Sequence, residues 1–165
     1  MAGSPKKRLA LDANFLLHLA EDKNFAHDFR EGFQARGYDL LVPPTAAGEL
    51  DVLGTYGSEP QRTYANQALE KISVWGCEPY SLSSTNLAIA EQFSNRLMAL
   101  KLIPEDEWND GRILGEASVA EIPLLVTSDK HLLDIDEDAL LMVFQEADLC
   151  PVHPVHPKRL LRALR

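Results

Sequence analysis

Short hydrophobic runs alternate with longer amphipathic stretches along most of this chain. The runs are predicted to be strands at 9–11, 39–42, 78–82 and 122–126, with a last extended piece at 152–155. The run at 122–126, Ile-Pro-Leu-Leu-Val, has no polar residue, as expected of a central strand in a parallel sheet that is covered on both faces.

The longer stretches have helical periodicity. Phe25, Phe29 and Phe33 recur every four residues within 24–35, and Gly37 follows as a stop signal. Further helices are predicted at 14–21, at 45–53 with Thr45 as the cap, at 61–74, at 84–100, at 104–120, and after Pro157. Strands alternating with helices predict an α/β fold of three layers, α/β/α, with a central, mostly parallel sheet.

Length and composition indicate an ordinary globular protein. With 165 residues, 45% of them hydrophobic and 25% charged, we expect one domain over residues 1–165. No apolar stretch approaches the ~20 residues of a membrane span, and Asp12 and Asn14 interrupt any signal-peptide core. Cys77 and Cys150 do not demand an oxidising compartment, so we expect a cytoplasmic protein with no membrane association.

The formal net charge of −9 argues against a simple nucleic-acid-binding module, which would use Lys and Arg to neutralise phosphates. It does not argue against an enzyme whose carboxylates hold cations. Basic residues gather near the two ends of the chain, where they could meet the phosphates of a nucleic acid or be solvated: Lys6, Lys7, Arg8, Lys158, Arg159, Arg162 and Arg165.

Polar residues follow two of the predicted strands directly. Asp12 and Asn14 come after 9–11, and Thr127 and Asp129 come after 122–126. In an open α/β sheet, ligands bind beyond the carboxyl ends of the strands, so Asp12 and Asp129 become neighbours if their strands are neighbours. Taken singly, each of these aspartates has an ordinary alternative role as a helix cap.

Two further acids, Glu49 and Asp110, fall on predicted helices, where singly they could face solvent. If the four acids share one pocket, they need protons or cations, because two like charges ~4 Å apart repel by about 4 kcal/mol at an effective dielectric constant of 20. Oxygen ligands favour Mg²⁺ or Mn²⁺, and the matching chemistry is metal-assisted phosphodiester hydrolysis.

The ordered set of motifs resembles the PIN-domain family, the fold of many metal-dependent ribonucleases and of toxins of bacterial toxin–antitoxin pairs. Asp12-Ala-Asn14 matches the family's Asp-x-Asn/Ser/Thr behind the first strand, and Thr127-Ser-Asp129 matches its Thr-x-Asp. Glu49 and Asp110 match its two helical acids, and the resemblance runs from about residue 9 to residue 164.

This resemblance implies a metal-dependent endoribonuclease that acts on RNA with Mg²⁺ or Mn²⁺. Asp12, Asp110 and Asp129 would be the main metal ligands, and Glu49 would assist as a ligand directly or through water. Asn14 and Thr127 would position the acids or the attacking water. We expect neighbours of Asp12, rather than Asp12 itself, to cap the following helix. An antitoxin partner and a homodimer are further expectations from the resemblance.

Several alternatives remain open at this point. The chain could be a PIN fold that only binds RNA or protein, or a receiver-like phosphoacceptor domain, although the early acidic pair of receivers is absent. The acidic stretch 134–149 is longer than in compact PIN domains, and we interpret it as a solvated loop rather than as support for the metal site through Asp134. Cys150, His153 and His156 suggest zinc, but one extended segment cannot surround a tetrahedral ion.

Overall fold

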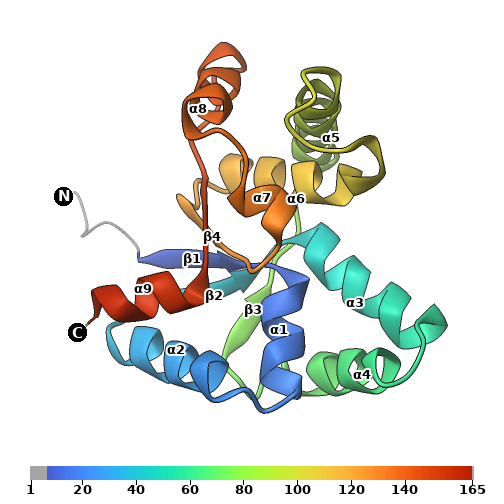
Figure 1. Cartoon of the computed structure of the whole chain (residues 1–165), viewed down its shortest axis with the longest axis vertical. Coiled ribbons are helices and arrows are strands. Elements are labelled where there is room, and N and C mark those ends of the chain that lie inside the picture. Colours follow the sequence, from blue (N-terminus) through green and yellow to red (C-terminus); the bar gives the residue numbers. More distant parts are fainter. Residues whose placement is uncertain (1–6, 165) are drawn as a thin grey trace.

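The computed structural model describes residues 7–164, and its centre is a five-stranded sheet (Figure 1). The strands are β1 (Arg8–Leu11), β2 (Asp39–Val42), β3 (Cys77–Pro79), β4 (Leu124–Val126) and β5 (His153–Val155). Their order across the sheet is β3-β2-β1-β4-β5, and every neighbouring pair is parallel. The predicted α/β class is therefore confirmed, with a sheet that is parallel throughout.

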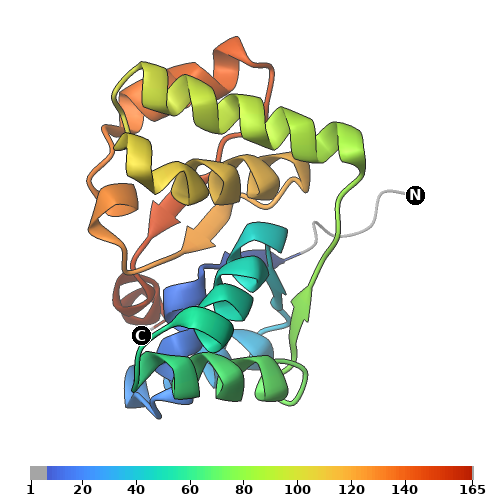
Figure 2. The same ribbon diagram turned by 90° about the vertical axis from the view of Figure 1, so that its right-hand side faces the viewer.

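Helices cover the sheet on two sides. They are α1 (Ala13–Ala20), α2 (Asn24–Ala35), α3 (Pro44–Tyr56), α4 (Gln61–Lys71), α5 (Ser84–Ala99), α6 (Trp108–Val119), α7 (Lys130–Leu133), α8 (Glu137–Glu146) and α9 (Pro157–Ala163). Figures 1 and 2 show α5, α6 and α8 on one side and α1, α2, α4 and α9 on the other. Helix α3 packs against both α4 and α6, so it lies where the two groups meet.

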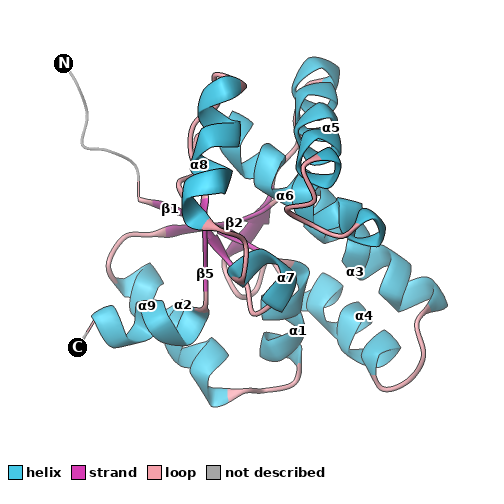
Figure 3. Cartoon of the chain, turned by 45° about the horizontal axis from the view of Figure 1, so that its top comes forward, coloured by secondary structure: helices cyan, strands magenta, loops and turns pink. Residues whose placement is uncertain are grey.

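The strands lie between these groups of helices, as Figure 3 shows by its colouring of strands and helices. In the central strand β1, Leu9, Ala10 and Leu11 are fully buried, which explains why this run has no alternation of polar and apolar residues. No helix within residues 7–164 is both long and apolar enough to cross a membrane. Lys6 and Arg165, two of the basic residues noted in the sequence, lie outside the described residues.

The acidic stretch 134–149 is the clearest error in the predicted elements. Most of it forms helix α8, and not the expected loop. The carboxylate of Asp136 caps this helix by accepting hydrogen bonds from the backbone N–H groups of Asp138 and Ala139. Leu140, Val143 and Phe144 are buried on its inner face, so the charges of the first turn hide an amphipathic helix.

Smaller differences concern where elements end. The helix predicted to stop at residue 53 continues to Tyr56, and the one predicted to reach residue 74 stops at Lys71. The helix predicted at 104–120 begins with a short 3₁₀ turn, η1 (Glu105–Glu107), before α6. The third strand covers Cys77–Pro79 and is shorter than the predicted 78–82.

Helices α5 and α6 approach each other closely at Gly115, which gives a prediction about stability. A Cβ atom at Gly115 would lie 2.8 Å from the Cα and 3.0 Å from the carbonyl oxygen of Ala90, and a backbone cannot yield as a flexible side chain does. Gly115→Ala is therefore expected to lower the free energy of unfolding by about 1–3 kcal/mol, measured by urea denaturation.

A matched substitution provides the control. A Cβ atom at Gly48, inside helix α3, would meet nothing within 4 Å. Gly48→Ala is therefore expected to raise the free energy of unfolding by up to about 1 kcal/mol through helix propensity alone. Equal stability of Gly115→Ala and wild type would mean that α5 and α6 pack less tightly than the structure shows.

Candidate metal centre

The centre lies where the strand order reverses direction. The chain moves outward from β1 to β2 and β3 on one side, and β4 and β5 occupy the other side. Leu11 of β1 is paired with Val126 of β4, so the residues that follow these strands emerge side by side. Such a switch point at the carboxyl ends of parallel strands is where open α/β sheets bind ligands.

Asp12, directly after β1, is buried and held by three hydrogen bonds. Its Oδ1 accepts from the backbone N–H of Ala13 (2.8 Å), and its Oδ2 accepts from the Thr127 hydroxyl (2.7 Å) and the Asn14 amide (3.2 Å). The bond to Ala13 makes Asp12 the N-cap of α1, so the expectation that its neighbours would cap this helix is wrong. One side chain both starts the helix and faces the site.

Thr127 and Asn14 connect the ends of the two strands. The Thr127 hydroxyl oxygen also accepts from the backbone N–H of Asp129 (3.0 Å) and from the Asn14 amide (3.2 Å). The side-chain oxygen of Asn14 in turn accepts from the backbone N–H of Ser128 (3.2 Å). Because these bonds cross from one strand end to the other, they fix the position of Asp12 relative to Asp129.

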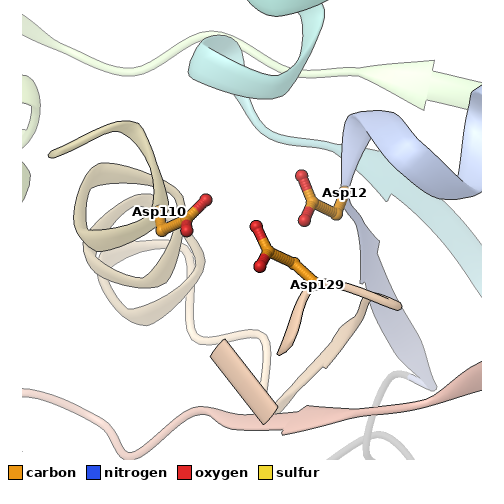
Figure 4. Close-up of side chains that lie close together, drawn as sticks. All are labelled: Asp12, Asp110 and Asp129. Carbon is orange, nitrogen blue, oxygen red and sulfur yellow. The ribbon is translucent and has the colours of Figure 1, made fainter. Parts of the chain in front are cut away.

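Asp110 reaches the same place from helix α6, which lies across from the ends of β1 and β4. Figure 4 shows the carboxyl groups of Asp12, Asp110 and Asp129 directed toward one another, and one oxygen atom from each lies within 4.8 Å of the others. Asp110 is only 5% exposed, and its Oδ2 is buried without a hydrogen-bond partner. An unpartnered buried carboxylate oxygen among two other carboxylates offers the kind of oxygen ligands that hard divalent cations prefer.

The crowding changes how these acids ionise. Burial raises the pKa of Asp12 to about 6, against the opposing effect of its hydrogen bonds to Thr127 and Ala13. Burial, and then the charges of Asp129 and Asp12, raise the pKa of Asp110 well above its ordinary value. Both shifts have the sign expected for carboxyl groups that lack a counter-charge.

Glu49 is near this triad of aspartates but does not belong to it. It projects from α3 and lines the same cleft as Asp110 and Asp129. Burial, followed by the charges of Asp12 and Asp129, raises its pKa to about 8. The charges of Asp12 and Asp129 therefore act on Glu49, which lies outside the group of three aspartates whose oxygens are within 4.8 Å of one another.

The other candidate ligands lie elsewhere. Asp134 is exposed at the end of α7 and outside the triad. His156 caps α9 by accepting from the backbone N–H of Lys158, and Cys150 is exposed. Within residues 7–164, the three aspartates are the only group of acids, histidines or cysteines with the spacing of a metal site.

Glu116 is a buried acid that the sequence did not reveal. Its carboxylate accepts from the backbone N–H (2.8 Å) and the hydroxyl (2.6 Å) of Thr45. Thr45 therefore does not cap α3 as predicted; Pro43 occupies the cap position without a side-chain hydrogen bond. This contact ties α3, which carries Glu49, to α6, which carries Asp110.

Three further residues of the cleft were also missed. Trp108, Asn109 and Arg112 line it beside Glu49 and Asp110. Trp108 and Asn109 directly precede Asp110 in the sequence, and Arg112 follows it two residues later. Their closeness to a candidate ligand was the available signal, because the start of a helix places such neighbours around the same opening.

Taken together, the all-parallel sheet, its covering helices and the acids at the ends of β1 and β4 define an α/β protein with a PIN-like fold. No protein-family model matches the sequence, and no curated protein is significantly similar to it. Among solved structures, the chain is similar to a chain of VapBC2 from Rickettsia felis, a complex bound to a DNA fragment from its promoter. The TM-score is 0.60 over 90% of this chain and 98% of that one, and at 16% identity this similarity shows the fold alone.

Proposed function

We propose that this protein is a metal-dependent endoribonuclease that hydrolyses RNA phosphodiesters with Mg²⁺ or Mn²⁺. The observation that carries the proposal is the convergence of Asp12, Asp110 and Asp129, with an unpartnered buried oxygen on Asp110. Three carboxylates this close are strongly unfavourable unless protons or cations compensate their charge. The donor set suits Mg²⁺ or Mn²⁺ better than Zn²⁺, because it contains no thiolate or imidazole.

In this proposal the three aspartates hold the cation, and Glu49 assists from the facing helix. When bound, a divalent cation supplies the activation of water and the charge stabilisation that phosphodiester hydrolysis needs. The chain itself contributes rigidity. Thr127 and Asn14 keep Asp12 and Asp129 in register through hydrogen bonds of 2.7–3.2 Å, and the Thr45–Glu116 contact holds Glu49 opposite them.

The strand order argues against the receiver-like alternative. Receiver domains have the order 2-1-3-4-5, whereas this sheet has β1 flanked by β2 and β4. The other alternative, a PIN-like module that only binds RNA or protein, would have no use for a buried, uncompensated carboxylate cluster. The intact triad therefore favours the nuclease.

The proposal also includes a protein partner. The sequence resembles a family that includes toxins paired with antitoxins, and the similar solved chain is part of the VapBC2 complex. We propose an antitoxin-like partner on these grounds, and a single functional unit spanning residues 1–165.

The proposal is tested by incubating the purified protein with end-labelled RNA and Mg²⁺ or Mn²⁺. Internal cleavage is expected with either metal, and EDTA and Asp12→Ala are expected to abolish it. Cleavage that persists equally in both controls would come from a contaminating nuclease, and the proposal would fall. Absence of cleavage on single-stranded and structured RNAs alike would favour the binding-only module.

A further inference from the structure

We propose that the cleft beside the carboxylates binds one unpaired nucleotide of the RNA by stacking its base against Trp108. The protein would then act on single-stranded RNA and not on duplex RNA. This inference rests on the proposed function, because it names the form of RNA that the same site accepts.

The cleft is large enough for such a ligand. Its volume is about 560 Å³, and its lining runs from Glu49, Asp110 and Asp129 to Trp108, Arg112 and Val52. Binding pockets for small organic molecules commonly measure about 300–1,000 Å³. A phosphate at Asp110 and Asp129 and its attached nucleoside beside Trp108 would therefore occupy one continuous space.

Trp108 is unusually exposed for so large an apolar side chain. It is 44% exposed, whereas Trp75 is 7% exposed, and it begins the helix that carries Asp110. The guanidinium of Arg112 covers one face of this indole, yet the residue stays exposed to water beside the cluster of acids. It does have the flat apolar face on which bases stack, whatever their sequence.

Contacts within the protein hold this indole in place. The guanidinium of Arg112 lies over the Trp108 ring, 4.6 Å from its centroid, and is held there by an ion pair with Glu91 of α5 (3.0 Å). The backbone carbonyl of Trp108 accepts a hydrogen bond from the Ser94 hydroxyl (2.7 Å). A ring fixed before binding loses little conformational freedom when a base stacks on it.

Stacking on a side chain selects for unpaired RNA. In a helix both faces of a base are covered by its neighbours, and sequence-tolerant recognition by aromatic side chains therefore uses splayed, single-stranded bases. Trp108 is the only aromatic residue among the described residues that line this cleft.

The charges that line the cleft are mainly negative, and this sets a condition for the binding of RNA. Asp106 and Glu107 line it together with the other acids, and Arg112 is the only cation among the described lining residues. A polyanion would be repelled from this surface unless divalent ions balance the carboxylates. Binding of RNA in the cleft is therefore expected to require Mg²⁺, in contrast to binding on an ordinary basic surface.

The first test follows binding without relying on cleavage. A Trp75→Phe protein has Trp108 as its single tryptophan, and stopped-flow mixing with an unlabelled single-stranded RNA in Mg²⁺ reports events that precede turnover. We expect quenching of the Trp108 fluorescence by the single strand, and none by the same sequence in a blunt duplex or by the single strand in EDTA. Unchanged fluorescence with the single strand, or equal quenching by the duplex, would overturn the inference.

The second test uses cleavage kinetics. Removing one base–aromatic stack costs about 1–3 kcal/mol, so Trp108→Leu should raise the KM for single-stranded RNA by about 5- to 150-fold, with kcat nearly unchanged. Trp108→Phe should restore most of the affinity. Tyr56→Leu is the matched control, because Tyr56 is an aromatic side chain of α3 that is 83% exposed and does not line the cleft.

The outcomes separate this inference from the proposed function. Cleavage with an unchanged KM in a folded Trp108→Leu protein would overturn the stacking site and leave the nuclease intact. Mg²⁺-dependent quenching by the single strand without any cleavage would support the stacking site and contradict the nuclease. If Trp108→Leu fails to fold, the fluorescence experiment and Trp108→Phe decide the matter.

Discussion

Asp129→Asn is expected to lower kcat/KM for RNA cleavage by about 10³-fold, equivalent to roughly 4 kcal/mol of transition-state stabilisation. The substitution removes one negative charge from the triad and leaves a neutral amide that binds Mg²⁺ or Mn²⁺ poorly. It changes little else. The Oδ1 of Asp129 accepts from the backbone N–H of His131 (2.9 Å), and asparagine can keep that cap at the start of α7.

Because the cap survives, the loss of activity should come without unfolding. Asp134→Asn is the matched control: it removes an exposed acid five residues further along the same segment and is expected to leave cleavage unchanged. Kinetics measured beside thermal melts of both variants check this. Asp129→Asn with wild-type kcat/KM would show that the carboxylate at this position is not needed for the reaction.

The second large effect concerns stability without metal. Burial raises the pKa of Asp12 to about 6 and that of Glu49 to about 8, and burial together with neighbouring charges raises the pKa of Asp110. In the unfolded chain these groups titrate near pH 4. Between about pH 4 and pH 8 these three acids therefore bind more protons in the folded protein than in the unfolded chain, and their contribution to stability falls as pH rises.

In EDTA, the melting temperature is accordingly expected to be lower at pH 8 than at pH 5. Asp110→Asn should reduce this difference and raise the melting temperature at pH 8 by about 5 °C, because each kcal/mol corresponds to roughly 2–4 °C in a protein of this size. Millimolar Mn²⁺ should raise the melting temperature of wild type at pH 8 more than at pH 5, since the cation competes with protons for the same oxygens. Melting temperatures that respond neither to pH nor to Mn²⁺ would contradict a carboxylate site.

The parts of the fold that follow local rules were predictable from the sequence. The hydrophobic run before Asp12 and the run before Thr127 predicted β1 and β4, and the four-residue spacing of phenylalanines predicted α2 with its observed bounds. The placement of Asp12 and Asp129 at one edge followed from the parallel arrangement, since the carboxyl ends of neighbouring parallel strands coincide.

What the sequence did not reveal depends on contacts between distant segments. Glu116 looked like one more helix acid, and only the packing of α3 on α6 makes it the partner of Thr45. Helix α8 was hidden because its first-turn acids resemble a solvated run, although they favour the N-terminal end of a helix. The exposure of Trp108 could not be read from its hydrophobicity, which by itself favours burial.

The central claim is that Asp12, Asp110 and Asp129 form a divalent-cation site, and anomalous diffraction tests it most directly. Crystals of the full chain grown or soaked with Mn²⁺ would be measured on the low-wavelength side of the manganese absorption edge. We expect an anomalous peak within bonding distance of carboxylate oxygens from all three aspartates, and no such peak in crystals of Asp110→Asn. An ordered triad without manganese density in the wild-type crystals, at millimolar Mn²⁺ and neutral pH, would contradict the account.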